Sequence, residues 1–215
     1  MTPRLAVLDY EMSNLRSATK ALERLGADVR VVTAPEDARD ADAVVLPGVG
    51  HFGEAMRRIR ARRLDVAVRD AADRGVPVLG ICLGLQLLFS ESEESPGVEG
   101  LGLLPGAVRR LRTDLKLPHI GWSRVAWEPG AALAPDDPSD AAAATYYFVH
   151  TYGCEPEDPS LVLGRADHGA SFCASAGRDR VMGVQFHPEK SSTAGLGLLG
   201  RWLAAVPTRD EVALS

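Results

Sequence analysis

The sequence predicts an α/β fold with one doubly wound, mostly parallel sheet and a mixed or antiparallel extension. Two patterns indicate this. Up to about residue 90, short apolar runs alternate with segments of helical periodicity, as in parallel strands joined by crossover helices. Between residues 100 and 186, short strand candidates are separated by Gly, Pro and Asp clusters. The 215 residues, 46% of them hydrophobic, suit one core, so we assign residues 1–206 to a single domain and 207–215 to a C-terminal tail.

The first half contains four expected strands, at residues 5–8, 29–32, 43–46 and 76–81. Three helices are expected between and after them. The first begins at a Ser13 cap, carries an apolar stripe over residues 15–25 and ends at Gly26. The others cover about 53–73 and 83–89, which completes the alternation of strand and helix.

The second half is expected to add short strands at residues 107–111, 120–125, 146–149, 161–165, 171–174 and 181–186. Residues 129–145 are rich in Ala, Pro and Asp, which predicts a surface loop. A closing helix is expected at 194–206, although glycines lower its helical propensity.

Composition and charge argue against several classes of protein. A net charge of −5 argues against a general nucleic-acid binder, which needs a basic surface. No apolar run approaches the ~20 residues that span a bilayer, and the first residues do not form a signal peptide. Cys82, Cys154 and Cys173 are widely spaced without a CxxC pair, which argues against a disulfide framework or a zinc site. We therefore expect a soluble cytoplasmic protein with no metal and no cofactor.

Arginines are concentrated between residues 57 and 63, at Arg57, Arg58, Arg60, Arg62 and Arg63. One interpretation is an anion site. A solvated helix face is favoured, because long basic side chains routinely cover exposed helix surface.

The segment from Gly80 to Gly84 carries the strongest chemical signal. Cys82 stands where a buried strand is expected to turn into a helix, which projects a nucleophile into the crevice at the strand ends. Small neighbours are needed because the backbone there is strained and must clear a substrate. The helix N-terminus favours a thiolate, and the Leu83 N–H is placed to bind an oxyanion. A buried structural cysteine remains an alternative for this segment alone.

His187 and Glu189 supply the base that such a cysteine needs. An apolar run ends at His187, and Pro188 stops the strand. Side chains two residues apart share a face in extended backbone, so Glu189 can hold the imidazole in one tautomer while the other nitrogen faces Cys82. The His-x-Glu pattern alone is a weak signal of catalysis, but together with the turn at Cys82 it predicts a thiol hydrolase. The spacing does not choose the substrate.

The turn Pro47-Gly48-Val49-Gly50 follows the third expected strand. Its glycines allow close backbone approach, or a peptide flip that turns an N–H toward the site. Val49 is able to hold the peptide with its carbonyl, rather than its N–H, toward the site. An ordinary glycine turn explains the local sequence at least as well.

Together these blocks resemble the class I glutamine amidotransferases. The resemblance rests first on Gly80-Ile81-Cys82-Leu83-Gly84-Leu85-Gln86 and Phe186-His187-Pro188-Glu189. It extends over nearly the whole chain through residues 46–53, 118–122, 146–152 and 187–191. These further segments are more particular than the triad motif, and they resemble glutaminase subunits that serve a (β/α)8-barrel cyclase.

The resemblance implies a flavodoxin-like sheet of the class I amidotransferase type, with glutamine bound over the strand ends. It implies a γ-glutamyl thioester on Cys82, a triad completed by His187 and Glu189, and ammonia passed to a barrel partner in a heterodimer. The residues assigned to oxyanion and glutamine binding are Gly48, Val49, Gly50, Leu83, Gln86, Thr151 and Tyr152. Those assigned to the partner interface are Asn14, Trp122, Tyr147 and Lys190.

Three positions depart from the family pattern, and alternatives stay open. The family usually has glycines where this chain has Glu11 and Ser13, and asparagine where it has Ser123. One alternative is the glutaminase subunit of an anthranilate or aminodeoxychorismate synthase, which usually carries Pro-Gly-Pro-Gly instead of Pro-Gly-Val-Gly. Others are a non-catalytic subunit, which loss of the triad would signal, and a cysteine peptidase of similar fold. Gln86 and Lys190 favour the amidotransferase.

Overall fold

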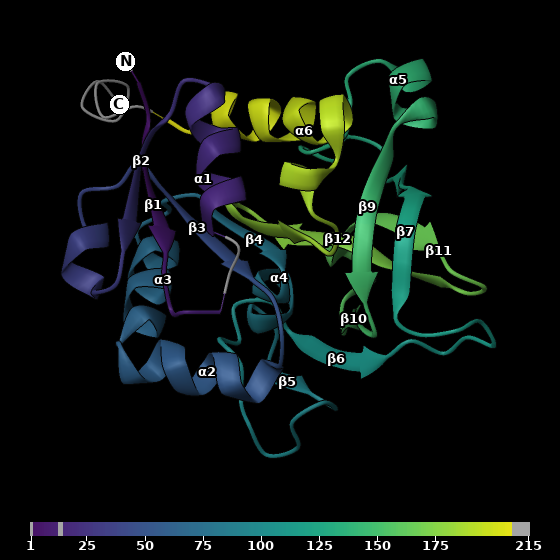
Figure 1. Ribbon diagram of the computed structural model, residues 1–215, viewed down its shortest axis with the longest axis horizontal. Helices are drawn as coiled ribbons and strands as arrows, with labels where there is room; N and C mark the ends of the chain where they lie inside the picture. The colour runs from purple at the N-terminus through teal and green to yellow at the C-terminus, as the bar shows by residue number, and fades with distance from the viewer. Residues whose placement is uncertain (1, 13–14, 208–215) are drawn as a thin grey trace.

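A parallel sheet forms the half of the molecule that carries the site (Figure 1). The computed structural model describes residues 2–12 and 15–207. Neighbouring strands run parallel in the order β2-β1-β3-β4-β13. Their bounds are Arg4–Leu8 for β1, Asp28–Val32 for β2, Ala43–Gly48 for β3, Val78–Cys82 for β4 and Val181–Val184 for β13.

Helices cover both faces of this sheet, as a doubly wound fold requires. On one face lie α1 (Leu15–Arg24) and α6 (Ser192–Ala204), and on the other lie α2 (Phe52–Ala61), α3 (Leu64–Asp73) and α4 (Leu83–Leu87) (Figure 1). Successive strand side chains point to opposite faces. Leu5 and Val7 of β1 therefore join the α1–α6 core, while Ala6 and Leu8 join the core under α2 and α3.

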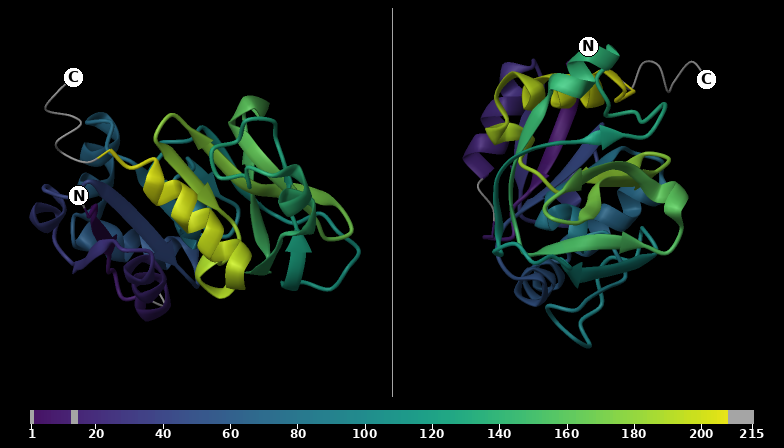
Figure 2. Two further views of the ribbon diagram at one scale, coloured as in Figure 1. Left: turned by 90° about the horizontal axis from the view of Figure 1, so that it is seen from above. Right: turned by 90° about the vertical axis from the view of Figure 1, so that its right-hand side faces the viewer.

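Antiparallel strands extend the sheet beyond β13, at the end of the molecule opposite the N-terminal strands (Figure 2). They are β12 (Ser171–Arg178), β10 (Tyr152–Pro156), β6 (Gly106–Arg110), and a branch of β11 (Val162–Asp167) and β8 (Ala126–Trp127). The short strand β5 (Glu91–Ser92) pairs parallel to β6. A separate antiparallel pair joins β7 (His119–Arg124) to β9 (Thr145–His150). The short helical elements are η1 (Pro35–Ala38), α5 (Pro138–Ala143), η2 (Pro159–Leu161) and η3 (Pro188–Lys190). The predicted fold class is confirmed, and none of the described helices is long and apolar enough to cross a membrane.

The expectation of one continuous helix over residues 53–73 is wrong. This segment forms two helices, and Arg63 between them has a left-handed backbone with φ of 57°. The spacing of buried side chains explains the break. Ile59 is the last buried residue of α2 and Leu64 the first of α3. A continuous helix would have placed Arg63, four positions after Ile59, on the buried stripe.

Three smaller expectations also need correction. The helix expected at residues 83–89 ends at Leu87, so α4 has only five residues. The loop expected at 129–145 contains α5, which Asp137 caps by accepting the Ser139 backbone N–H at 2.7 Å. No strand was expected at β10, whose glycine and proline are unfavourable in strands. The predicted Ser13 cap lies outside the described residues.

Candidate active site

Cys82 lies at the turn from β4 into α4, in a backbone conformation that few non-glycine residues adopt. Its φ and ψ are 55° and −109°. The turn is crowded as well. A Cβ on Gly84 would collide with the Leu46 carbonyl oxygen, and one on Gly80 would lie 2.7 Å from the Leu85 nitrogen. Both glycines are therefore required for the chain to present the Cys82 side chain at the strand ends.

His187 follows β13, the parallel neighbour of β4, so it lies at the same edge of the sheet as Cys82. Its Nδ1 is 2.7 Å from Glu189 Oε1, and both side chains are buried. Because a carboxylate only accepts, Nδ1 carries the proton of this bond. Within the described residues, Nε2 makes no well-aligned hydrogen bond. It is therefore the ring nitrogen available for proton transfer.

The charge state of His187 follows from its surroundings. Burial alone lowers the pKa of its imidazole. The hydrogen bond and charge of Cys82, together with those of Glu189, outweigh burial and raise the pKa to about 9. The imidazole is thus held as a cation at neutral pH, and a cation beside a sulfur stabilises the thiolate form.

A cavity of about 320 Å³ opens onto the sulfur. Its lining residues are Val49, Gly50, Cys82, Leu83, Gln86, Glu94, Pro118, Val149, His150, Thr151, Tyr152 and His187. All the residues predicted for oxyanion and glutamine binding line it except Gly48. Gly48 pairs with Cys82 across β3 and β4, where a Cβ would collide with the Tyr10 hydroxyl. The lining also includes Glu94 and His150, for which no binding role was expected.

The Val49 N–H points away from the cavity. It donates to the Met12 carbonyl oxygen at 2.9 Å. Gly50, with φ of 97°, lies against the Met12 side chain. The loop after β1 therefore holds the peptide that would have to turn before its N–H could bind an oxyanion. Leu83 begins α4, where the first backbone N–H groups have no partner within the helix.

Glu11 adopts φ of 63°, the conformation that glycine adopts without strain. Its carboxylate forms ion pairs with Arg58 at 3.3 Å and Arg62 at 2.6 Å, and its carbonyl oxygen accepts from Arg58 at 3.2 Å. The replacement of a family glycine is thus accommodated by contacts to α2 and the residue after it. Arg57 and Arg58 also form ion pairs with Glu54 on the helix surface, which fits the favoured interpretation of a solvated helix face better than an anion site.

Three of the four residues predicted for a partner interface lie at the β7–β9 end of the site. Trp122 and Tyr147 are register partners whose rings meet edge to face at 5.9 Å. Trp122 is 54% exposed and Ile120 on the same strand is 61% exposed. Lys190 ends η3, next to Glu189. Asn14 lies outside the described residues.

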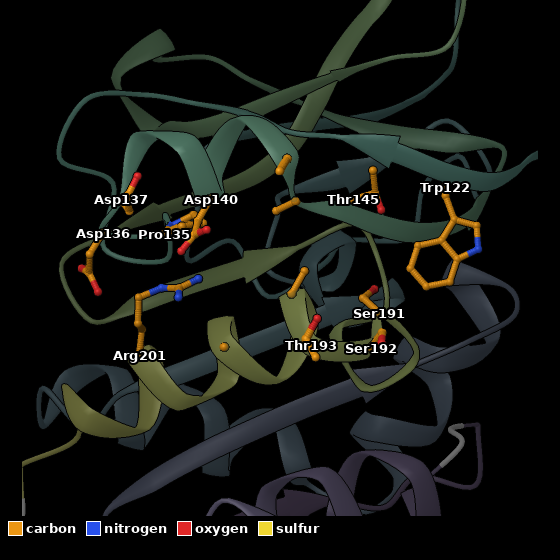
Figure 3. A pocket seen from close by; sticks show the side chains of 14 residues that line it. Trp122, Pro135, Asp136, Asp137, Asp140, Thr145, Ser191, Ser192, Thr193 and Arg201 are labelled. Carbon is orange, nitrogen blue, oxygen red and sulfur yellow. The ribbon is translucent and has the colours of Figure 1, made fainter.

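A larger cavity, of about 680 Å³, lies between α5 and α6 (Figure 3). Arg201 projects from α6 on one side, and Asp137 and Asp140 lie on the other. Its lining contains neither cysteine nor histidine among the described residues. Thiol chemistry therefore belongs to the smaller cavity.

Comparison with known proteins identifies similar chains. Residues 6–199 match the family described as Glutamine amidotransferase class-I. The chain is 48% identical to "Imidazole glycerol phosphate synthase subunit HisH" of Moorella thermoacetica, over 91% of each protein. It is 45% identical to the subunit of the same name from Herpetosiphon aurantiacus, over 96% of this chain and 97% of that one.

Solved structures show the same fold. The structure described as PurLQS from Thermotoga maritima superposes with a TM-score of 0.76 at 22% identity, over 96% of this chain and 100% of that one. A structure described as glutamine amidotransferase gives 0.71, also at 22% identity, over 94% and 99%.

Proposed function

The chain belongs to the class I glutamine amidotransferase family, and from this membership we propose that it is the glutaminase subunit of an imidazole glycerol phosphate synthase. It hydrolyses L-glutamine to glutamate and ammonia. The ammonia serves the formation of imidazole glycerol phosphate and aminoimidazole carboxamide ribonucleotide in histidine biosynthesis. The observation that carries this proposal is the convergence of Cys82, His187 and Glu189 at one cavity, in a chain similar to such subunits over more than nine-tenths of its length.

The first half of the reaction forms a thioester. The Cys82 sulfur attacks the side-chain carbonyl carbon of glutamine, and negative charge develops on the carbonyl oxygen. His187 then gives its Nε2 proton to the leaving nitrogen. The C–N bond breaks, ammonia departs, and the γ-glutamyl group stays on the sulfur.

The second half returns the enzyme to its starting state. His187, now neutral, takes a proton from water as the water oxygen attacks the thioester carbon. The C–S bond breaks and glutamate leaves. Glu189 holds Nδ1 throughout, so the same nitrogen, Nε2, serves both steps.

Backbone groups at the cavity complete the proposed site. We assign oxyanion binding to the Leu83 N–H and to the strand of Gly48, Val49 and Gly50 once its peptide turns toward the cavity. Glutamine is held by the Gln86 side chain and by the backbone at Thr151 and Tyr152, which the cavity lining supports.

The proposed partner is the (β/α)8-barrel cyclase subunit, bound as a heterodimer. Trp122, with Ile120 beside it, presents the exposed apolar surface that the centre of an interface needs. Tyr147 packs on Trp122 and Lys190 lies beside the triad, so this surface adjoins the cavity. We propose that ammonia passes to the cyclase across it, that one amidotransferase domain spans residues 1–206, and that the subunit works in the cytoplasm, where a thiol stays reduced.

Substitution and labelling of the nucleophile test the proposal. Cys82→Ser should abolish glutamine hydrolysis by the complex with the cyclase while leaving the thermal unfolding transition in place. The glutamine analogue diazo-oxo-norleucine should add once, on Cys82, as located by mass spectrometry. An adduct on buried Cys154 or Cys173 instead, or undiminished turnover in the variant, would contradict the assignment of Cys82 as the nucleophile.

A further inference from the structure

A chain of hydrogen bonds, partly buried at its Tyr152 end and buried at Gln185, leads from a backbone carbonyl to the sulfur of Cys82. Gln185 is completely buried, and its Nε2 lies 3.8 Å from Cys82 Sγ. Its Oε1 accepts from Gln86 Nε2 at 2.9 Å. Gln86 Nε2 also donates to the Tyr152 carbonyl oxygen, again at 2.9 Å.

The direction of every bond in this chain follows from its first member. The Tyr152 carbonyl oxygen only accepts, so the Gln86 atom beside it must be the amide nitrogen. Both hydrogens of that nitrogen are then used, and the Gln185 atom that it meets must be an oxygen. The other amide atom of Gln185, the NH₂ group, consequently faces the sulfur as a donor.

We propose that Gln185 is a catalytic residue whose side-chain N–H donates to the Cys82 sulfur and stabilises its thiolate. The inference rests on the proposed role of Cys82 as nucleophile. Gln185 adds stabilisation of the thiolate that α4 provides only weakly, because a helix of five residues sums few peptide dipoles. The side-chain amide of Gln185 keeps its N–H donor at every pH, whereas His187 transfers its Nε2 proton to the leaving nitrogen during the reaction.

His150 and His119 act as positioning residues behind the carbonyl. His150 Nδ1 donates to the Tyr152 oxygen at 2.9 Å, which leaves Nε2 to accept from His119 Nδ1 at 3.3 Å. His119 Nε2 lies 3.1 Å from Ser123 Oγ. Burial, reinforced by the charge of neighbouring histidines, lowers the pKa of both imidazoles to about 4. Both rings are therefore neutral at pH 7, and each keeps the tautomer that the chain needs.

Alkylation of Cys82 by iodoacetamide tests the donor without glutamine, because only the thiolate reacts. The rate is followed against pH in the full chain, with the modified residue located by mass spectrometry. Other titratable groups near the sulfur or its cavity are common to all variants. They are His187, Glu189, Tyr10, Cys154, Glu94, His150 and Tyr152.

Two variants of Gln185 separate its chemistry from its volume. Gln185→Met keeps the size and removes the donor, and should slow alkylation at neutral pH about fivefold, the factor for a hydrogen bond of about 1 kcal/mol. Gln185→Glu turns an acceptor toward the sulfur and should slow it further. Ser175→Ala is the matched control, since Ser175 is buried on β12 and donates to Gly183 instead. Wild-type rates in both folded Gln185 variants would overturn the proposal.

A second measurement needs no change at Gln185. In the ¹⁵N-labelled wild type, the side-chain amide protons of Gln185 should shift with pH at the midpoint of the alkylation profile, and Cys82→Ser should abolish that shift. If the resonances of the Gln185 side-chain amide did not change with pH, the proposal would be overturned even if the variants failed to fold. If the wild-type complex had no glutaminase activity, the proposed function would be overturned. The proposed hydrogen bond from Gln185 to the Cys82 sulfur would not be affected by that result.

Discussion

At the scale of single residues, Glu189 and His187 depend on each other. Glu189 is buried, and its Oε2 makes no hydrogen bond with any residue that the structure describes. Its charge is therefore balanced chiefly through Oε1, by His187. A buried charge that loses its partner is costly, so changes at either position affect both stability and turnover.

We expect His187→Asn to lower glutamine turnover by roughly 10²–10⁴-fold, the usual contribution of a positioned acid–base group. Glu189→Gln should lower it less, because the amide can still orient the ring but no longer stabilises the cation. Steady-state kinetics of the complex should place both losses mainly in kcat rather than KM. Near-normal turnover in His187→Asn would show that another group acts as the base.

The raised pKa of His187 also makes stability depend on pH. The folded-state value of about 9 lies above the ordinary 6.5. Its contribution is therefore complete below pH 6.5 and is lost as pH rises through 9. The shift corresponds to roughly 3 kcal/mol at most. Urea unfolding of wild type and His187→Asn should give a stability difference that shrinks over this interval. A difference that stays constant with pH would contradict the assigned charge state.

Residue-scale prediction from the sequence succeeds where a motif imposes its own geometry. A cysteine with glycine two positions away on each side, and the i, i+2 spacing of His187 and Glu189, sufficed to place Cys82 together with that pair. Gln185 was missed, although it stands two positions before His187 and the same spacing puts it on that face. Glu94 was missed because nothing in the local sequence connects the loop after β5 to the N-terminus of α2, where Glu94 accepts from the Phe52 N–H at 2.7 Å.

At the scale of elements, the turn after β3 and the loop after β1 act together. The Val49 N–H is bound to the Met12 carbonyl, so turning it toward the cavity first requires breaking that bond. A partner can drive the change only by binding the turned state more tightly. The sequence-based expectation that Val49 holds its peptide in the wrong orientation remains a prediction, and this hydrogen bond supports it.

We expect the free subunit to be a poor glutaminase, because a missing oxyanion donor costs about 10²–10³-fold in rate. Turnover should rise with the cyclase and again with the cyclase's nucleotide ligand. Val49→Gly, which frees the peptide, should raise the rate of the free subunit toward that of the complex. Equal rates for the free subunit, the complex and the liganded complex would rule out such a latch and leave only a channel for ammonia.

Elements were predictable where periodicity was strong. The central strands β1, β3 and β4 contain apolar runs, and α6 was placed to within two residues at each end. The break at Arg63 contains neither glycine nor proline and is visible only in the five-residue step from Ile59 to Leu64. The strands of the extension depend on pairing with distant partners, as in β10 between β6 and β12. Local sequence therefore could not order them.

At the scale of the whole molecule, the exposed apolar side chains on β7 lie at the opposite end of the fold from β2 (Figure 1). We expect Trp122→Ala to weaken binding of the cyclase roughly 30-fold or more, as for an interface hot spot of about 2 kcal/mol. Calorimetric titration would measure it. Val31→Ala on β2, which is 49% exposed, is the matched control. Equal affinities for both variants would place the interface elsewhere.

Glu11 has a consequence for the order in which substitutions can be accepted. A non-glycine residue in the left-handed conformation costs roughly 1–2 kcal/mol, and here Arg58 and Arg62 hold the side chain that occupies it. With glycine at position 11, Arg62 would lose this ion pair and be freer to vary, whereas Arg58 would still bind Glu54. With glutamate at position 11, a change of Arg62 removes a contact that holds the strained residue, so the same change is less harmful in one background than in the other. A history that leads from glycine to Glu11 therefore passes more easily through chains in which Arg62 came first.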